Sequence, residues 1–446
     1  MIIAGGLVYT PDGPREADVH VGGEQIERVE PWGQHGGEDV VDARGLLVLP
    51  GAVDAHVHGR DPGFPAKETF ATLTQAAAAG GVTTLLDMPN TLPGVSTADI
   101  FEAKVRAIAA AAEVDFGLWG LVRASSTEAE IEGLATAGAI GLKAYLGYAV
   151  RKSTGQVLYS PAALEPDLEA PASYGTIARL LSALAAAGVP LAVHAEDPGV
   201  LLAAARRVET YEDLLESRPA AAEAVAIAAT GALAVLGGLR LHVVHISSAA
   251  GLAAAKAARA AGADLSIETC PQYLWLTAAD YGRLGPVMKN FPLVRGADDR
   301  AALRAGLLAG EIDSVGTDHA PHTDEEKLGH SLAEAHAGSP GVQTLLLSCL
   351  QLARDAGDLR LAVRWACTAP AEIFGLADRK GAIRPGADAD LVLVDPKGTT
   401  STEKGWMLSK QRHASLGGLE FGFAIRRVFL RGSAPGPGRG RFLRPA

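Results

Sequence analysis

The sequence predicts an α/β protein: a (β/α)8 TIM barrel with a small β-sandwich domain built from both ends of the chain. Short apolar runs occur eight times between residues 53 and 318, and Ala/Leu-rich helical segments separate them. Short strands with Gly and Pro turns occupy both ends. Nearly continuous apolar runs are typical of buried parallel strands, and their alternation with helices indicates a parallel sheet. No G-x-G-x-x-G follows any run, which argues against a dinucleotide-binding sheet.

The two ends of the chain are expected to form one domain. Residues 1–50 show alternating apolar positions with turn signals about every eight to twelve residues, as in small all-β units. The same pattern returns in 377–446, so we expect one β-sandwich from 1–50 and 377–446, with a barrel of residues 51–376 inserted between them. The Pro/Gly/Arg-rich tail after Ser433 is expected to be an extended arm.

The eight barrel strands are expected at the apolar runs. They are VDAHVH (53–58), GVTTLLDMP (81–89), DFGLWGLV (115–122), GLKAYLG (141–147), LAVHAE (191–196), LHVVHIS (241–247), LSIETCP (265–271) and DSVGTD (313–318).

Composition excludes several classes of protein. With 48% hydrophobic and 20% charged residues among 446, the chain is neither disordered nor fibrous. Its 40 basic and 51 acidic residues give a net charge of −11 without a basic cluster, so we expect no nucleic-acid partner. No uncharged apolar stretch reaches about 18 residues, so no membrane span is expected. Three scattered cysteines and a start without a basic n-region predict reduced thiols and a cytoplasmic location.

Polar side chains lie where the predicted strands end, and barrel enzymes place their chemistry at those carboxyl ends. Strand periodicity turns residues two apart to the same face, so both histidines of the first run would enter the barrel mouth. A single strand-end histidine is more often a hydrogen-bonded core residue than a ligand. Six such residues in apolar strands instead indicate a metal site, because unpaired buried charges are costly. The six residues are His56, His58, Lys143, His194, His245 and Asp318.

The ligand set favours two metal ions. Imidazole and carboxylate suit Zn²⁺, with Mn²⁺, Co²⁺ or Fe²⁺ as alternatives. One catalytic zinc needs only three protein ligands, and the surplus here indicates two divalent ions about 3.5–4 Å apart. As an ammonium, Lys143 would repel the metals, whereas a carbamate formed with CO₂ would bridge them. A lysine paired with Asp318 or another acid is the alternative.

Motifs along nearly the whole chain resemble those of the cyclic amidohydrolases, a group that includes dihydroorotases, allantoinases and hydantoinases. The matching elements are DAHVHGRDPGF, AAAAGGVTTLLDMPNT, GLKAYLG, VHAED, VVHISS, ETCPQYL, GTDHAPHTDEEK and KGAIRPGADADLVLVDP. The resemblance implies a small cyclic amide or ureide as substrate and a homo-oligomer, dimer or tetramer. It also implies a metal site in which carboxylated Lys143 bridges. His56, His58 and Asp318 would bind the first metal, and His194 and His245 the second.

Some residues favour dihydroorotases within this group. The elements around Arg60 and Asn90 resemble those that hold the substrate carboxylate there, and His322 and Asn290 would match further substrate contacts. Other features favour hydantoinases and allantoinases. They are Gln272 in ETCPQYL, Lys143 with the residues that follow it, and the long segment 148–174, which is expected to overhang the site.

The expected reaction is hydrolytic, reversible ring opening of dihydroorotate to N-carbamoyl-aspartate, a step of pyrimidine biosynthesis. A metal-bridging hydroxide would attack a ring carbonyl, with Asp318 as general base and then general acid. The alternative is an allantoinase or a hydantoinase/dihydropyrimidinase acting on a related ring. Two further alternatives are a catalytically inactive partner protein and a deaminase of free bases. The first would have lost metal ligands and the second would lack Lys143, whereas this chain has all six predicted ligands.

Overall fold

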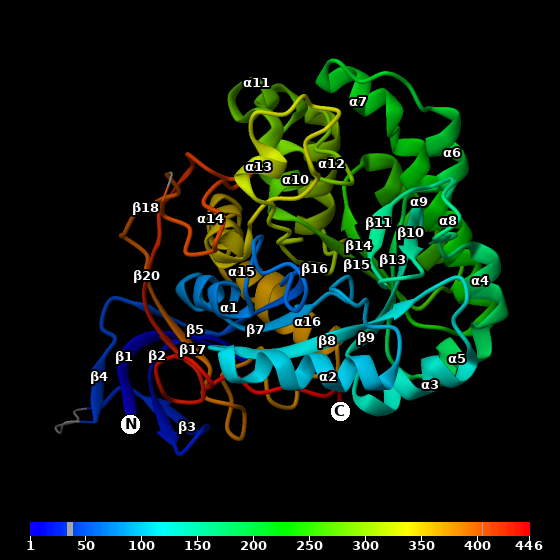
Figure 1. Cartoon of the computed structure of the whole chain (residues 1–446). Helices are drawn as coiled ribbons and strands as arrows, with labels where there is room; N and C mark the ends of the chain where they lie inside the picture. Colours follow the sequence, from blue (N-terminus) through cyan, green and yellow to red (C-terminus); the bar gives the residue numbers. More distant parts are fainter. Residues whose placement is uncertain (34–38, 404) are drawn as a thin grey trace.

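The computed structural model describes residues 1–33, 39–403 and 405–446, and its centre is a parallel barrel (Figure 1). Eight strands pair in the order β16-β15-β14-β13-β9-β8-β7-β6. A parallel bridge between Val57 and His319 joins the two ends of this sheet. All eight predicted runs form barrel strands. These are β6 (Ala52–Val57), β7 (Val82–Asp87), β8 (Asp115–Val122), β9 (Gly141–Tyr145), β13 (Leu191–His194), β14 (Leu241–Ile246), β15 (Leu265–Thr269) and β16 (Ser314–Val315).

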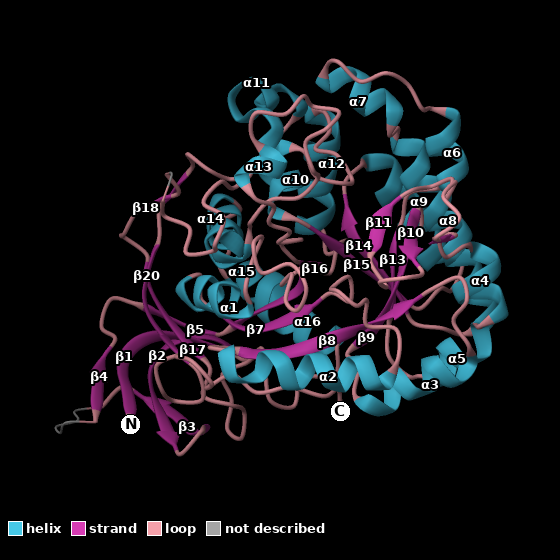
Figure 2. Cartoon of the chain, viewed as in Figure 1, coloured by secondary structure: helices cyan, strands magenta, loops and turns pink. Residues whose placement is uncertain are grey.

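Helices cover the outside of the barrel (Figure 2). Several begin at Ser or Thr residues whose side chains accept from the first turn, as at Thr69, Thr127 and Ser248. The helices are α1 (Phe70–Ala79), α2 (Ala98–Ile108), α3 (Glu128–Ala137), α4 (Tyr174–Arg179), α5 (Leu181–Ala186), α6 (Pro198–Ala203), α7 (Tyr211–Ser217), α8 (Ala220–Gly237), α9 (Ala249–Ala260), α10 (Pro271–Trp275), α11 (Tyr281–Leu284), α12 (Ala297–Leu308), α13 (Asp324–Lys327), α14 (Leu345–Asp355), α15 (Arg360–Val363) and α16 (Ala369–Ile373).

Both ends of the chain build a second sheet, as predicted. Its order is β20-β17-β5-β1-β2-β3, with β4 paired to β1. The β1 pairs with β4 and β5 are parallel, and the other pairs are antiparallel. The strands are β1 (Ile2–Thr10), β2 (Gly13–Gly22), β3 (Gln25–Pro31), β4 (Val40–Asp42), β5 (Leu47–Pro50), β17 (Leu391–Asp395) and β20 (Ala424–Phe429), with β18 (Thr400–Ser401) and β19 (Glu420–Phe421) as a separate pair. The domain boundaries at 50/51 and 376/377 stay predictions.

The tail after Ser433 packs against the barrel instead of extending as an arm. Phe116 in β8 donates its N–H to Arg441 O at 2.9 Å, and Leu443 donates to Phe116 O at 2.7 Å. Asp115 accepts from the Arg441 N–H at 2.8 Å. Leu443 is buried in an apolar cluster with residues of several barrel strands. The tail therefore pairs with the start of β8, away from the strand ends that carry the histidines.

The segment 148–174 forms a small antiparallel sheet of β10 (Tyr148–Arg151), β11 (Val157–Tyr159) and β12 (Leu168–Glu169). Tyr148 and the whole of β11 line the cavity at the carboxyl ends of the barrel strands. The expected overhang is thus present and supplies part of the cavity wall.

Tyr211–Gly237 is the one stretch of the described residues whose length and hydropathy would suffice for a membrane span. It consists of two helices, α7 and α8, which meet at Arg218 and Pro219. Since α8 packs against α9 in the outer layer, α8 is a helix of the barrel.

Candidate metal centre

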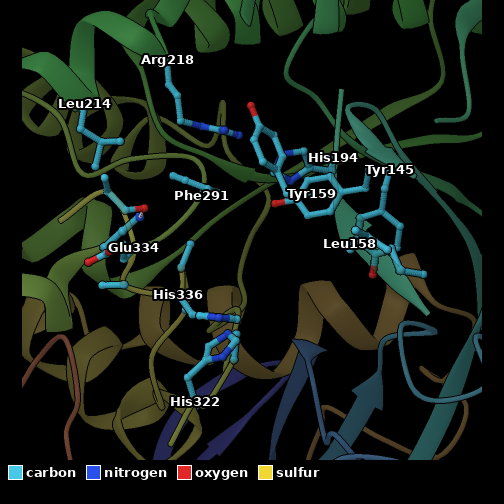
Figure 3. A pocket seen from close by; sticks show the side chains of 18 of the residues that line it. Tyr145, Leu158, Tyr159, His194, Leu214, Arg218, Phe291, His322, Glu334 and His336 are labelled. Atoms are coloured by element: carbon cyan, nitrogen blue, oxygen red, sulfur yellow. Dashed lines mark hydrogen bonds between the residues drawn. The ribbon is translucent and has the colours of Figure 1, made fainter. Parts of the chain in front are cut away.

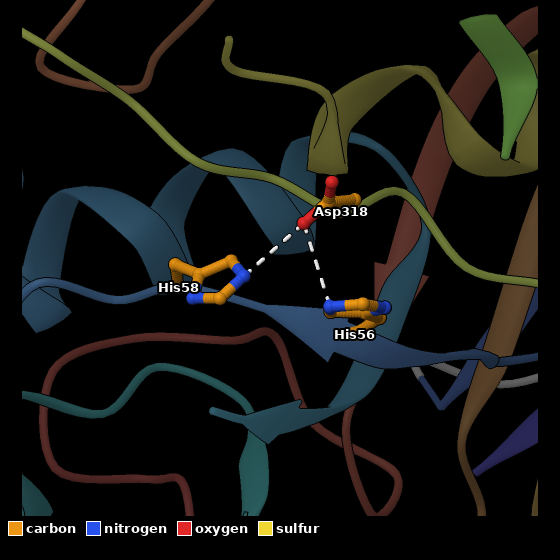
Figure 4. Close-up of side chains that lie close together, drawn as sticks. All are labelled: His56, His58 and Asp318. Carbon is orange, nitrogen blue, oxygen red and sulfur yellow. Dashed lines mark hydrogen bonds and ion pairs between the residues drawn. The ribbon is translucent and has the colours of Figure 1, made fainter. Parts of the chain in front are cut away.

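Three predicted ligands meet where the first and last barrel strands end (Figure 4). His56 and His58 come from the end of β6, and Asp318 lies three residues after β16. Oδ1 of Asp318 is 3.4 Å from Nε2 of His56 and 3.1 Å from Nε2 of His58. Ligand atoms of all three residues lie within 4.8 Å of one another. The group is buried and has the size and donor types of a metal site.

The outer nitrogens of these two imidazoles are already bonded. Nδ1 of His56 donates to Oε1 of Glu268 at 2.9 Å, and Nδ1 of His58 donates to Oδ1 of Asn90 at 2.6 Å. A neutral imidazole that donates through Nδ1 has a lone pair on Nε2. Both lone pairs therefore point at the carboxylate of Asp318, an arrangement that a cation between them would stabilise. Such outer partners are typical of metal-bound histidines.

The His58 imidazole is neutral because it is buried, whereas the Asp318 carboxyl is ionised. Desolvation lowers the pKa of His58 to about 4. Burial acts to raise the pKa of the Asp318 carboxyl, but His56, His58 and Lys143 together outweigh it and lower that pKa. A neutral imidazole and a carboxylate are the protonation states in which both residues can bind a metal.

His194 and His245 form a second pair of donors. Nδ1 of His194 lies 3.0 Å from Nε2 of His245, and Nε2 of His194 donates to Glu196 at 2.9 Å. Glu196 is in turn paired with buried Arg218. Burial lowers the pKa of both histidines. As at His56, an outer carboxylate fixes the tautomer, so the inner lone pair of His194 faces the neighbouring imidazole.

Lys143 lies in β9 between these groups and is fully buried. Its Nζ has no hydrogen-bond partner among the described residues. Burial lowers its pKa to about 7, although Asp318 and Glu268 act to raise it. Burial of a charged amine without a hydrogen-bond partner costs free energy. With a pKa of about 7, a large share of Lys143 is in the neutral amine form, which is the form that reacts with CO₂. The alternative of a lysine paired directly with Asp318 finds no such contact within the described residues.

Backbone strain gathers at the same place. Arg60, His245 and Asp318 have φ angles of 60°, 42° and 50°, in the left-handed region that non-glycine residues seldom adopt. Strained residues of this kind cluster at functional sites, where the surrounding structure holds them.

The six predicted ligands line a cavity of about 1150 Å³. Figure 3 shows His194 and His322 among the side chains of its wall. Arg60, Asn90 and His322 also line it, as expected of substrate contacts. Nη2 of Arg60 lies 3.3 Å from Nε2 of His322. Asn90 also makes a contact that the sequence did not indicate. Its side-chain carbonyl oxygen accepts a hydrogen bond from Nδ1 of His58.

Asn290 does not line the cavity, although both of its neighbours in the chain do. Its buried amide donates to Met288 O at 3.3 Å and to Ser415 Oγ at 3.2 Å. The position of the Asn290 side chain therefore gives no support to the expected substrate contact, which stays a prediction. Lys289 and Phe291 line the cavity, whereas the side chain of Asn290 faces Met288 and Ser415.

Sequence reasoning missed three buried residues that hold the ligands: Glu196, Arg218 and Glu268. Glu196 lies two residues after His194, and Glu268 lies inside the apolar strand β15. Both are fully buried acids, and a buried acid in a strand requires a partner. That signal was present in the sequence, but it did not identify which histidine each acid would contact.

The geometry agrees with a family match over most of the chain. Residues 47–434 match the Amidohydrolase family. The chain belongs to this family. The resemblance to cyclic amidohydrolases is thus confirmed, and this amidohydrolase is a hydrolase that acts on carbon–nitrogen bonds of cyclic amides.

Known relatives of this amidohydrolase match most or all of its length. An allantoinase of Rubrobacter xylanophilus is 37% identical over 100% of this chain and 97% of its own. A dihydroorotase of Halobacterium salinarum is 36% identical over 86% of this chain and 84% of its own. The structure of L-hydantoinase (dihydropyrimidinase) from Arthrobacter aurescens has a TM-score of 0.90 and 29% identity, with 99% of each chain covered.

Proposed function

We propose that this amidohydrolase opens the hydantoin ring of allantoin to give allantoate. The observation that carries this proposal is the full-length similarity to allantoinases, which covers 97–100% of the chain in the first five relatives. The dihydroorotases cover 84–86%. The allantoinases therefore match more of the chain than the dihydroorotases do. The motifs around Arg60 and Asn90 had led us to expect dihydroorotate as the preferred substrate.

The cavity supports a substrate with a substituent on its ring. Its volume of about 1150 Å³ exceeds what a bare hydantoin ring needs, so the ureido group of allantoin has space. Polar donors are placed along the wall, among them the guanidinium of Arg60 and the amine of Lys67. The rim therefore offers hydrogen-bond donors to ureido or carboxylate oxygens.

Dihydroorotate is the second candidate, and one observation favours it. Arg60, Lys67 and His322 gather on one wall of the cavity, where Nζ of Lys67 is 3.2 Å from Nδ1 of His322. Lys67 also pairs with Glu326 at 2.8 Å, so Arg60 is the cation of this wall that would favour a ring bearing a carboxylate.

We propose that the site holds two divalent metal ions, with zinc as the favoured metal. His56, His58 and Asp318 would hold one ion, His194 and His245 the other, and Lys143 would bridge them as a carbamate. The supporting observations are the converging lone pairs at Asp318 and the buried amine of Lys143, which has no hydrogen-bond partner among the described residues. When bound, such ions polarise a carbonyl and lower the pKa of water toward about 7.

Asp318 is proposed as the proton carrier of the reaction. Both imidazole contacts use its Oδ1 atom, which leaves Oδ2 for proton transfer. The carboxylate would accept a proton from the attacking water and deliver it to the ring nitrogen as the amide C–N bond breaks. The products are a carboxylate and a ureido group, so the atoms of one water are consumed. Arg60 and Asn90 would bind the polar substituent of the ring and so orient a substituted ring during this transfer.

The test compares ring opening of allantoin, dihydroorotate and unsubstituted hydantoin by the purified, metal-supplemented protein. We expect the highest kcat/KM with allantoin. A higher value with dihydroorotate would replace the proposed substrate with the second candidate. Hydrolysis of none of the three rings, with both metals bound, would support an inactive relative.

A further inference from the structure

The connection between β18 and β19 reaches from the terminal part of the chain to the loops around the cavity (Figure 1). The side-chain amide of Gln411 donates to Ala66 O and to Lys67 O, both at 3.1 Å. Nδ1 of His413 lies 3.0 Å from Oδ1 of Asp324. This connection therefore touches both the loop that follows β6 and the segment that follows β16, and each of them carries proposed metal ligands or substrate contacts.

Glu68 is the buried charge that this connection holds. Its carboxylate is fully buried. Oε2 accepts a hydrogen bond from the Ser409 hydroxyl, and Oε1 accepts from the Thr72 hydroxyl and from the Lys410 N–H, the latter at 3.0 Å. Oε2 also faces Nε2 of His319 at 3.5 Å. A buried carboxylate requires such partners, and the connection between β18 and β19 supplies two of them.

The imidazole of His319 is held at both of its nitrogens. Nδ1 accepts from the backbone N–H groups of Gly341 at 3.1 Å and Val342 at 3.3 Å. A neutral imidazole that accepts through Nδ1 carries its proton on Nε2, the atom that faces Glu68. At 3.5 Å this contact is longer than a hydrogen bond, so Glu68 acts on the ring through its charge. The two amides and the carboxylate together fix the orientation of the ring.

The backbone of His319 lies between two proposed metal ligands. Its carbonyl oxygen accepts from the His58 N–H at 2.7 Å, and a parallel bridge to Val57 joins the two ends of the barrel sheet there. It directly follows Asp318, whose φ angle is 50°. A strained residue of this kind persists only where its surroundings hold it in place. The anchored ring of His319 is such a support, because it fixes the peptide that joins it to Asp318.

We propose that Glu68 is a positioning residue for His58 and Asp318, and that Ser409 keeps Glu68 in place. This inference rests on the proposed function, in which Asp318 carries the proton and binds a metal. Neither Glu68 nor Ser409 is among the described residues that line the cavity, so neither touches the substrate. Both act through His319 and its backbone. The terminal part of the chain thereby takes part in setting the geometry of the reaction.

The first test is a double-mutant cycle of Glu68→Gln and Ser409→Ala in the full-length, metal-supplemented protein, with the ring that the wild type opens fastest. Glu68→Gln removes the charge and keeps the size, so kcat per folded, metal-loaded chain should fall by about 10- to 100-fold while KM stays near that of the wild type. Ser409→Ala should lower kcat less. The double variant should lose no more than Glu68→Gln, because Ser409 acts only through Glu68.

A purely structural role of Glu68 would lower stability and leave kcat per folded chain unchanged. An unchanged kcat of folded Glu68→Gln, or losses that add in the double variant, would therefore overturn the proposal. If Glu68→Gln does not fold, the deciding measurement is the kcat of folded Ser409→Ala, and a wild-type value would overturn the proposal.

Zinc affinity tests the same inference without the reaction. Competition with a chelator should show about 10-fold weaker binding of Zn²⁺ by Glu68→Gln, because both positioned ligands face the ion. Ser348→Ala is the matched control: like Ser409, Ser348 is a buried serine with a hydrogen bond, here to Leu345 O in α14 at 2.8 Å. It should change neither kcat nor zinc affinity. A wild-type zinc affinity of Glu68→Gln would overturn the positioning role. Weakened zinc binding in the variant, with a wild type that opens none of the three rings, would refute only the proposed reaction.

Discussion

The Nε2 atom of His58 lies 3.1 Å from Oδ1 of Asp318 while its Nδ1 donates to Asn90. A neutral imidazole has one N–H, and the contact with Asn90 uses it. The short distance therefore brings a lone pair against a carboxylate oxygen. The fold places these two acceptors together from strands at opposite ends of the sheet, which explains why a cation suits this position.

Replacing Asp318 with asparagine should lower kcat by at least about 100-fold, the lower range for loss of a general acid–base. Asparagine keeps the size of the side chain but cannot accept and return a proton. Steady-state kinetics with allantoin and with dihydroorotate would measure the effect. Turnover near that of the wild type would exclude Asp318 as the proton carrier.

Lys143→Ala should reduce the bound metal from two ions per chain to one or none. The variant removes the only proposed bridge, and alanine leaves space for a small carboxylic acid. Elemental analysis after gel filtration would count the metals, and addition of formate or acetate should restore part of the second equivalent. Two tightly bound ions in untreated Lys143→Ala would disprove the bridge.

Glu196→Gln should weaken metal binding by about 10- to 100-fold, the usual effect of removing an outer partner of a metal-bound histidine. The amide loses the charge that pairs with Arg218 and holds the His194 tautomer. Competition with a metal chelator would measure the affinity. Glu216→Gln is the control, because its carboxylate is 51% exposed and pairs with Arg206 at the surface. Equal affinities of the two variants would contradict the role of Glu196.

Arg60→Met should lower kcat/KM for dihydroorotate more than for hydantoin. A hydrogen bond to a charged group contributes about 1.5–3 kcal/mol, which corresponds to a factor of roughly 10 to 150. Hydantoin has no carboxylate, so its turnover should change little. The metal content should be unchanged, which separates loss of a substrate contact from damage to the site. An equal decrease of kcat/KM with both rings would show that Arg60 does not bind the carboxylate of dihydroorotate.

The barrel was predictable because each strand is a separate apolar run. The proposed ligands lie at or near the ends of their runs, except Lys143, which lies in the middle of β9. The strand pattern alone was enough to predict the positions of His56, His194 and Asp318 at the barrel mouth. The direction of the Asn290 side chain could not be predicted, because residues 289–292 form neither a helix nor a strand and no periodicity applies to them. Glu268 was missed because its partner, His56, lies 212 residues away and only the closed barrel joins them.

Leu443→Ala should lower the free energy of unfolding by about 2–5 kcal/mol, as for other buried leucines. Its side chain is 3% exposed and lies in an apolar cluster with residues of several barrel strands. Urea denaturation would measure the change. Arg444→Ala, at the adjacent exposed position, should change the value by less than about 0.5 kcal/mol. Equal stabilities of the two variants would mean that the tail is dispensable.

The pairing of the tail with β8 has a consequence for synthesis on the ribosome. Asp115 and Arg441 are 326 residues apart in the chain. At about 5–20 residues per second, translation of the intervening sequence takes roughly 15 to 65 s. During this time the amino end of β8 can pair with β7, but it lacks the partner that the tail supplies at Phe116. That edge must be shielded by other means, such as chaperones. Nascent chains that stop before residue 440 should therefore be recognised by the quality-control machinery, even though every metal ligand has been translated.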